Sequence, residues 1–460
     1  PGANTWIISP RQMFSRVLIA NRGAIARRVV RACQALGIES VAVYSDVDAG
    51  APYLEEASQA YHLPGSKASE TYLEQAAILE AVAATGADAV HPGYGFLAEN
   101  AAFAEAVEGA GARFIGPRPT WLATMGDKVA ARGLARQHGF PVFAGSDRLD
   151  GEASLAEIQA AAENVGYPLL VKPIGGGGGI GMRVVTAPDE LEGAVRQAGS
   201  LAGAAFADAG VFLERWAPNA RHIEFQVLGD GAGGALHLHE RDCSLQRRHQ
   251  KVLEESPAPG IDRSELVGLA ERARQLVAEI GYDNVGTLET LRAGPDDFGF
   301  LEMNTRIQVE HGVTEMVTGV DLVAAQIRLA AGESLPAGAP LNGHALEARI
   351  YAEHPVSQLP STGRLAVFEP PMGLHGVRVD TGYQAGQWVT PHYDPLLAKV
   401  IGHGRTREQA IGRVLVALRA FSIVGVDTNI PLLYGVLGDA EFLAGQVDTG
   451  YLARYLARSA

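Results

Sequence analysis

The sequence contains only two cysteines, Cys33 and Cys243, in 460 residues. This scarcity excludes a disulfide framework and a CxxC zinc site, and it favours a reducing compartment, so we expect a cytoplasmic protein. Basic residues are also few, because 38 Lys and Arg stand against 52 Asp and Glu, giving a formal net charge of -14. We therefore expect no nucleic-acid partner and no anionic membrane surface as a partner. No apolar run approaches the roughly 18 residues of a membrane span.

Two common catalytic motifs are also missing. The sequence has no G-x-S-x-G, so acyl transfer through a serine nucleophile has no support. It has no G-x-x-x-x-G-K-[ST], which excludes a P-loop nucleotide hydrolase. Cys243 lies among cations that could lower its pKa, but no resolving partner is evident, so we interpret it as structural.

The first part of the chain has a regular order of elements. The length predicts about three domains. Residues 1–13 lack the layout of a signal peptide, and we expect a tag or a loose extension there. From residue 14 to residue 123, short apolar strands alternate with helical segments. This alternation predicts a doubly wound parallel sheet in an α/β domain.

The rest of the chain mixes strands and helices less regularly. Residues 124–335 are predicted to form an α+β domain with an antiparallel sheet, including a strand pair at 286–292 and 298–303. Residues 335–343 are rich in Pro and Gly and predict a linker. Residues 343–455 begin with strand-like segments and continue with a helical one, which predicts a C-terminal α+β domain.

A glycine-rich run covers residues 175–181. Gly176, Gly178 and Gly181 satisfy the dinucleotide fingerprint G-x-G-x-x-G, but that fingerprint requires a helix directly afterwards. Residues 182–185 (MRVV) instead predict a strand. A strand, glycine loop and strand resemble the hairpin with which kinases cover phosphate, since glycines let backbone N–H groups approach phosphate oxygens. The alternative is a floppy surface loop.

Two lysines lie close to this run or to the start of its domain. Lys172 ends the strand before the glycines, and Lys128 follows Gly126 and Asp127. An ammonium group at the mouth of a glycine loop can bind phosphate. The alternative for each lysine alone is a solvated side chain.

Residues 302–310 (EMNTRIQVE) carry alternating polar side chains. An extended segment would place five of them on one face: Glu302, Asn304, Arg306, Gln308 and Glu310. Glu289, in the strand-like run before them, could approach Glu302 across a hairpin. Carboxylate and amide oxygens suit Mg²⁺, which binds through a few carboxylates and substrate phosphates. The alternative is a solvent-facing strand with salt bridges.

Residues 241–251 (RDCSLQRRHQK) form a dense cation cluster in an acidic protein. Its charged members are Arg241, Arg247, Arg248, His249 and Lys251, with Asp242 beside them. A small anion or a phosphate is the expected partner. No aromatic residue is interleaved, which argues against a nucleic-acid groove. The alternative is a solvated basic loop.

Together these segments resemble the biotin carboxylase component of biotin-dependent carboxylases, which are ATP-grasp enzymes. The resemblance covers about residues 14–455, and its motifs are long: IANRG, HPGYGFLAEN, ERDCSLQRRHQK and EMNTRIQVEH, at 19–23, 91–100, 240–251 and 302–311. It implies an N-terminal doubly wound domain at 14–123, a central ATP-grasp domain with a glycine-rich lid at 124–335, and a C-terminal α+β domain at 343–455.

The resemblance also implies roles for single residues. Those expected to bind ATP phosphates are Lys128, Lys172, Gly177, Gly178 and Gly179. Those expected around adenine and ribose are Glu214, Arg215, His222, Gln246 and His249. Those expected to hold Mg²⁺ or Mn²⁺ are Glu289, Glu302 and Asn304. Those expected to fix bicarbonate are Lys251, Arg306, Gln308 and Val309. Glu310 is the implied general base, Arg349 the group that stabilises the biotin enolate, and Tyr94 a neighbour of the biotin ring.

The implied cofactors are ATP and a divalent ion, with carrier-bound biotin as substrate. None of the six methionines is followed by Lys, so the chain has no Met-Lys biotinylation site. We therefore expect biotin on a separate carrier protein or domain, a carboxyltransferase partner and a homodimer. The leading hypothesis is the first half-reaction of an acyl-CoA carboxylase. The alternatives are the same step in a urea or pyruvate carboxylase, another ATP-grasp carboxylate-amine ligase, and a degenerate ATP-binding scaffold.

Three positions depart from the family pattern. Ala24 stands where the family commonly has Glu, and Gly312 replaces a common proline next to the Glu-His pair. Ile180 stands where acyl-CoA carboxylases commonly have Lys or Arg, and isoleucine there resembles urea carboxylases. The sequence alone does not name the final carboxyl acceptor.

Overall fold

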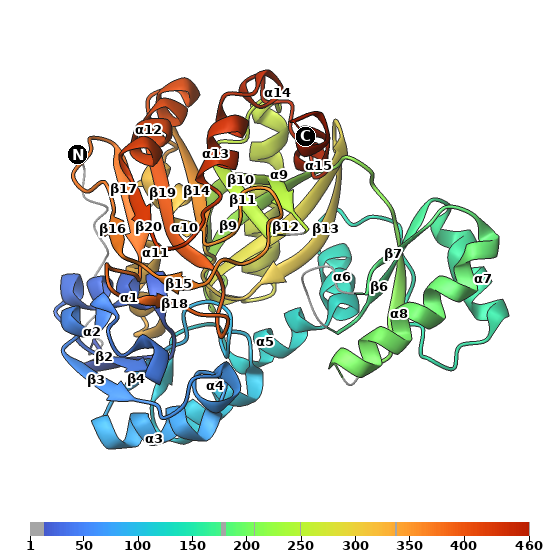
Figure 1. Ribbon diagram of the computed structural model, residues 1–460. Helices are drawn as coiled ribbons and strands as arrows, with labels where there is room; N and C mark the ends of the chain where they lie inside the picture. Colours follow the sequence, from blue (N-terminus) through green and yellow to red (C-terminus); the bar gives the residue numbers. More distant parts are fainter. Residues whose placement is uncertain (1–12, 176–180, 207, 249, 336–337, 460) are drawn as a thin grey trace.

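A computed structural model of the chain describes residues 13–175, 181–206, 208–248, 250–335 and 338–459. No helix in these residues is long and apolar enough to cross a membrane. Figure 1 shows a large body and a smaller lobe that projects from it.

The N-terminal part is the predicted parallel sheet. Its strand order is β3-β2-β1-β4-β5, and every pair is parallel. The strands are β1 (Arg16–Ile19), β2 (Glu39–Tyr44), β3 (Gln59–His62), β4 (Ala89–His91) and β5 (Arg113–Phe114). The helices are α1 (Gly23–Leu36), α2 (Pro52–Glu56), α3 (Gln75–Thr85), α4 (Ala101–Gly109) and α5 (Pro119–Gly126). Because β1 is covered on both faces, Val17, Leu18 and Ile19 are completely buried, as parallel strands require.

The projecting lobe contains a small antiparallel sheet of order β7-β6-β8. Its elements are β6 (Leu169–Pro173), β7 (Arg183–Val185), β8 (Val211–Arg215), α7 (Leu155–Val165) and α8 (Leu191–Phe206). α6 (Lys128–Gln137) lies between lobe and body (Figure 1). β6 and β7 pair in antiparallel register, so the glycine-rich run joins two strands, as predicted. A Rossmann-type helix does not follow the glycines.

An eight-stranded antiparallel sheet, of order β13-β12-β9-β10-β11-β14-β19-β17, forms the centre of the body. Its strands are β9 (Arg221–Asp230), β10 (Ala235–Arg247), β11 (Gln250–Ser256), β12 (Asp283–Gly294), β13 (Asp297–Asn304), β14 (His344–Tyr351), β17 (Val377–Thr381) and β19 (Leu396–Gly404). β11 pairs with β14, so this sheet continues across the predicted linker and joins the central and C-terminal parts of the chain.

Helices and short strands complete the body. The helices are α9 (Arg263–Glu279), α10 (His311–Thr318), α11 (Leu322–Ala330), α12 (Arg407–Ala420), α13 (Ile430–Leu437), α14 (Ala440–Leu443) and α15 (Tyr451–Ser459). Two short strand pairs are β15 (Gly363–Arg364) with β18 (Trp388–Val389), and β16 (Val367–Glu369) with β20 (Ser422–Val424). The largest apolar core packs α12 and α13 against β14 and β19.

The extended conformation considered for residues 302–310 is wrong beyond Asn304. β13 ends at Asn304, and α10 begins at His311, so the chain must turn between them. Glu99 of the N-terminal part stabilises this turn, because its carboxylate accepts hydrogen bonds from Thr305 N (3.1 Å) and Arg306 Nε (3.0 Å). Glu302 and Asn304 therefore lie on a strand, whereas Arg306, Gln308 and Glu310 lie on a loop.

Candidate active site

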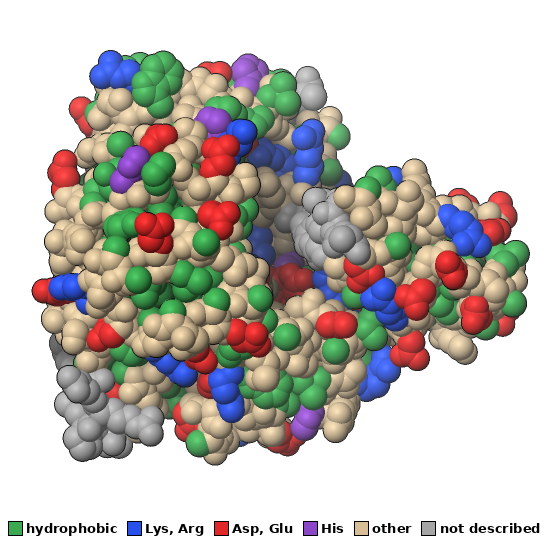
Figure 2. Space-filling model, turned by 90° about the horizontal axis from the view of Figure 1, so that it is seen from below, with side chains coloured by type: hydrophobic (Ala, Val, Ile, Leu, Met, Phe, Trp, Pro, Cys, Tyr) green, Lys and Arg blue, Asp and Glu red, His purple; other side chains and the backbone are tan. Residues whose placement is uncertain are grey.

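A cavity of about 740 Å³ lies where the three parts of the chain meet. Figure 2 shows a hollow between the body and the lobe, with acidic and basic side chains inside it. Most residues that the sequence singled out line this cavity: Tyr94, Lys128, Lys172, His222, Gln246, Lys251, Glu289, Glu302, Asn304, Arg306, Gln308, Val309, Glu310 and Arg349. The cavity size matches that of pockets for cofactor-sized ligands.

Two predicted nucleotide residues do not line the cavity. Glu214 lies behind its wall, where its carboxylate accepts a hydrogen bond from Lys172 Nζ at 2.9 Å and pairs with Arg132 Nη1 at 2.7 Å. Arg215 forms an ion pair with Asp297 at 2.8 Å and stacks over the ring of Phe143. Gly177, Gly178, Gly179 and His249 lie outside the described residues.

Lys251 is the centre of the charge network. Its Nζ donates hydrogen bonds to Glu224 Oε2 (2.6 Å), Glu289 Oε1 (2.8 Å) and Glu310 Oε1 (2.6 Å). Burial lowers the pKa of Lys251, but the three carboxylates outweigh burial and hold that pKa well above its ordinary value. Two shifts in the register of β10 and β11 lie close to Lys251, and bulges commonly re-aim side chains at active sites.

Glu310 lies between two cations. Its Oε1 accepts from Lys251, and its Oε2 accepts from Arg349 Nη2 at 2.9 Å. Burial raises the pKa of Glu310, yet Lys251 and Arg349 overcome that effect and hold the pKa well below its usual range. The carboxyl group is therefore ionised at neutral pH and can accept a proton.

Arg241 and Lys251, at the two ends of the cation cluster, lie on the paired strands β10 and β11 and not on a solvated loop. Arg241 is completely buried, and its guanidinium donates to Glu224 Oε1 at 2.6 Å and to Gln226 Oε1 at 2.8 Å. It also donates to Gln308 Oε1, which fixes that side chain in the loop after β13. Cys243 is buried as well, and burial together with Glu224 raises its pKa well above the ordinary value, so the neighbouring cations do not activate it.

Glu289 and Glu302 are cross-strand partners in the hairpin of β12 and β13, as predicted. Glu289 is buried and Glu302 is partly buried, and desolvation together with the charge of Glu289 raises the pKa of Glu302. Asn304 Oδ1 accepts from Arg306 Nη2 at 2.6 Å, while the buried Asn304 Nδ2 has no hydrogen-bond partner among the described residues. Two adjacent buried carboxylates repel each other unless a cation lies between them, so this pair fits a divalent ion.

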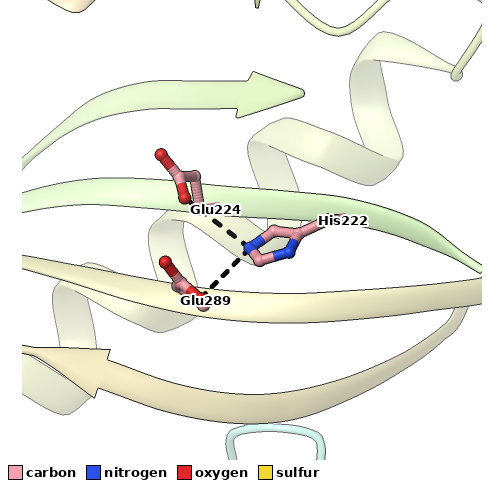
Figure 3. Close-up of side chains that lie close together, drawn as sticks. All are labelled: His222, Glu224 and Glu289. Atoms are coloured by element: carbon pink, nitrogen blue, oxygen red, sulfur yellow. Dashed lines mark ion pairs between the residues drawn. The ribbon is translucent and has the colours of Figure 1, made fainter. Parts of the chain in front are cut away.

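Glu289 also belongs to a second group of donors, which Figure 3 shows. His222 Nε2 lies 3.2 Å from Glu289 Oε2 and 3.7 Å from Glu224 Oε2. Donor atoms of these three residues lie within 4.8 Å of one another. Gln246 Nε2 lies 2.8 Å from His222 Nδ1, so the imidazole is held on both sides.

Sequence reasoning missed Glu224, although β9 carries a usable signal. His222, Glu224 and Gln226 alternate with Ile223, Phe225 and Val227, which places three polar side chains on one face of a strand. All three polar side chains are buried, whereas the apolar ones pack into the core under α9. It also missed Glu254, whose contact with Arg349 depends on a pairing between distant strands.

Three family models match the chain in succession. They are biotin carboxylase, N-terminal domain (residues 13–122), carbamoyl-phosphate synthase L chain, ATP binding domain (127–338), and biotin carboxylase C-terminal domain (347–454). The biotin carboxylase of Allochromatium vinosum is 46% identical over 447 residues, covering 96% of this chain and 99% of that one. A pyruvate carboxylase subunit of Methanothermobacter thermautotrophicus is 43% identical over 447 residues, covering 96% and 90%.

A solved structure has the same fold. It is the biotin carboxylase domain dimer of the Hydrogenobacter thermophilus 2-oxoglutarate carboxylase, in complex with MgADP, ADP and bicarbonate. It is 41% identical with a TM-score of 0.92, and the match covers 96% of this chain and 98% of that one. The fold and the enzyme class predicted from the sequence are confirmed, and this chain belongs to the biotin carboxylase family of ATP-dependent ligases.

Proposed function

We propose that this chain uses the Lys251–Glu310–Arg349 network to carboxylate carrier-bound biotin. Bicarbonate attacks the γ-phosphate of ATP and gives ADP and carboxyphosphate. Carboxyphosphate then breaks down to CO₂ and phosphate, phosphate takes the N1′ proton of biotin, and N1′ attacks CO₂. The observation that carries the proposal is one buried, ionised carboxylate, Glu310, held between the cations Lys251 and Arg349 on the cavity wall.

Glu310 acts as the general base on bicarbonate. Bicarbonate is a poor nucleophile until it loses its proton, and a carboxylate within hydrogen-bond reach can take that proton. A bicarbonate anion that binds Lys251 and Arg306 competes with Glu310 for cationic partners. The competition raises the proton affinity of Glu310, so substrate binding itself strengthens the base.

The loop after β13 fixes the anion. Arg306 is oriented by Glu99 and Asn304, and Gln308 is oriented by Arg241 and Glu289. The carbonyl of Val309 accepts a hydrogen bond from Lys399 Nζ, which sets the backbone at this point. These contacts hold the reacting oxygen in line with the γ-phosphate, which is the main requirement in phosphoryl transfer.

Lys128, Lys172 and the glycine-rich run are the proposed phosphate contacts. His222 and Gln246, which line the cavity, are the proposed contacts of adenine and ribose, and Glu214 and Arg215 would support them from outside the lining. Burial lowers the pKa of Lys128, and the charge of Glu302 opposes that effect. Glu289, Glu302 and Asn304 would hold the divalent ion, Mg²⁺ or Mn²⁺. When bound, that ion supplies charge neutralisation at the ATP phosphates.

Arg349 and Tyr94 serve the biotin half of the reaction. Arg349 stabilises the negative charge left on the ureido oxygen when N1′ loses its proton. Tyr94 lines the cavity, and burial raises its pKa, so the phenol stays neutral beside the ring.

We propose a biotin carboxyl carrier protein or domain and a carboxyltransferase as partners, a homodimer as the assembly, and a cytoplasmic location. The acceptor proposed first is an acyl-CoA. Urea and pyruvate are the alternatives, since a pyruvate carboxylase subunit matches this chain almost as well as a biotin carboxylase does.

ATP cleavage with Mg²⁺ and bicarbonate, measured with and without free biotin, tests the proposal. ADP release should require bicarbonate and rise with biotin. Glu310→Ala should abolish bicarbonate-dependent ADP release with and without biotin, whereas Arg349→Ala should strongly lower the biotin-dependent rise and leave a measurable residue of it. Arg148→Ala removes an exposed arginine of the lobe and is the control. Unchanged carboxylation in Glu310→Ala would contradict the assignment of the base.

A further inference from the structure

Two buried carboxyl groups lie behind Arg349. Glu254 of β11 and Glu347 of β14 are direct cross-strand partners, and both are 0% exposed. Like charges directly opposite each other destabilise an antiparallel pair, and burial increases the penalty. Arg349 lies two residues after Glu347 and therefore on the same face of β14. The sheet thus places one guanidinium beside two carboxyl groups.

Arg349 joins Glu254 to the cavity. Its Nη2 lies 2.5 Å from Glu254 Oε1 and 2.9 Å from Glu310 Oε2. Arg349 and Glu310 line the cavity, whereas Glu254 does not. The guanidinium therefore contacts Glu310 on the side of the cavity and Glu254 on the side of the sheet.

The contact with Glu254 is incomplete in this structure. Neither carboxyl oxygen of Glu254 accepts a hydrogen bond from a described residue, and the buried Arg349 Nε donates none to one. Burial, Glu347 and Glu310 raise the pKa of Glu254, whereas Arg349 lowers it. Buried acceptors without a donor are costly, so the two oxygens of Glu254 favour any guanidinium position that brings Arg349 N–H groups toward them.

We propose that Glu254 is a positioning residue for biotin carboxylation. It holds the Arg349 guanidinium in place when Glu310 interacts with bicarbonate instead of with Arg349. The inference rests on the proposed function, in which Arg349 acts on biotin and Glu310 on bicarbonate. Glu254 touches neither substrate. It acts through Arg349, and its effect is confined to the step that Arg349 serves.

The variant that tests this is Glu254→Gln, with Glu255→Gln as its matched control. Glu255 is the next residue, is also buried, and pairs with His344 at 2.7 Å and Arg407 at 2.6 Å, away from the cavity. Both variants remove one buried carboxylate from β11. Glu254→Asp is a second variant, which keeps the charge and shortens the reach.

Two rates are measured on the full chain: bicarbonate-dependent ATP cleavage without biotin, and fixation of labelled bicarbonate on free biotin. Glu254→Gln should lower kcat for fixation about tenfold, which corresponds to ~1.4 kcal/mol of lost transition-state stabilisation. Its ATP cleavage without biotin should stay within about twofold of wild type, and Glu255→Gln should keep both rates. The kcat of Glu254→Asp for fixation should lie between the values of Glu254→Gln and wild type.

A double-mutant cycle separates positioning from a general structural role. In an Arg349→Ala background, Glu254→Gln should cause no further loss of fixation, because the two residues act as one unit. An additive loss, or an equal fall of both rates in Glu254→Gln, would overturn this inference alone. A wild-type chain that cleaves ATP but fixes no bicarbonate on biotin would overturn the proposed function and this inference with it.

Discussion

Replacing Lys251 by methionine should destabilise the folded chain strongly. Lys251 Nζ contacts three carboxylates at 2.6, 2.8 and 2.6 Å, and all three are buried. Removing one partner from a buried ion pair typically costs about 3–5 kcal/mol, because the other charge is left uncompensated. Here one ammonium serves three charges, so we expect a loss at or above that range. That is a large share of a typical folding free energy of about 5–15 kcal/mol.

The loss should depend on pH in a defined direction. Lys251 holds the pKa values of Glu289 and Glu310 below the ordinary value, against the effect of burial. Carboxyl groups with depressed pKa values stabilise the fold fully above an unfolded pKa of about 4.3, and this contribution is lost as pH falls through the folded values. In Lys251→Met, burial raises both pKa values, and protonation relieves the repulsion. The free energy of unfolding of the wild type should therefore exceed that of Lys251→Met by the largest amount near pH 7. The two values should approach each other toward pH 4.

Urea unfolding at several pH values between 7.5 and 4.5, without divalent ions, measures this difference. Lys67→Met is the control, since Lys67 and Glu70 form an exposed pair at 3.3 Å, which contributes little to stability. Lys251→Met should also lose bicarbonate-dependent ATP cleavage. A variant as stable as wild type at pH 7.5, or a difference that does not change with pH, would refute the electrostatic account of this site.

Three further perturbations follow from the same geometry. Glu302→Gln should raise the Mg²⁺ concentration needed for half-maximal ATP cleavage about tenfold or more, because it removes one of two facing carboxylates; an unchanged requirement would exclude Glu302 as a ligand. Lys399→Met should raise the KM for bicarbonate, since it frees the Val309 carbonyl, and equal effects on the KM values for ATP and bicarbonate would contradict that role. Asp48→Asn should cost about 3–5 kcal/mol in urea unfolding, because Arg22 donates to Asp48 at 2.7 Å in a buried contact, whereas the exposed Asp46→Asn should cost little.

The N-terminal sheet was predictable because each of its strands that the sequence indicated has a local pattern, a short apolar run. A strand such as β1 is covered on both faces, so it appears in the sequence as a short, continuous apolar run between turn residues. The hairpin of β12 and β13 was predictable for a similar reason, because its strands are neighbours in sequence. The pairing of Glu289 with Glu302 followed from that hairpin.

The site was only partly predictable, because long-range pairing decides the rest of it. The pattern of residues 302–310 suggests a strand, yet contacts from Glu99, about two hundred residues earlier, support a turn instead. The contact between Glu254 and Arg349 requires β11 and β14 to pair across the predicted linker. No periodicity within either strand reveals its partner. Alternation in β9 does reveal a buried polar face, and applying that rule there would have found Glu224.

The buried charges of this cavity are better explained by catalysis than by stability. Replacing a buried ion pair by well-packed apolar side chains often leaves stability unchanged or increases it. Stability of the fold therefore gives no reason to bury Glu224, Glu289 and Glu310 around Lys251. In the resting site the chain's own carboxylates neutralise its cations. An incoming anion must compete with those carboxylates, and the carboxylate that loses a cation gains proton affinity. Glu310 is one of these carboxylates. In the proposed mechanism, binding of bicarbonate and activation of the base would therefore be the same event, and a site without bicarbonate would keep Glu310 weakly basic beside ATP.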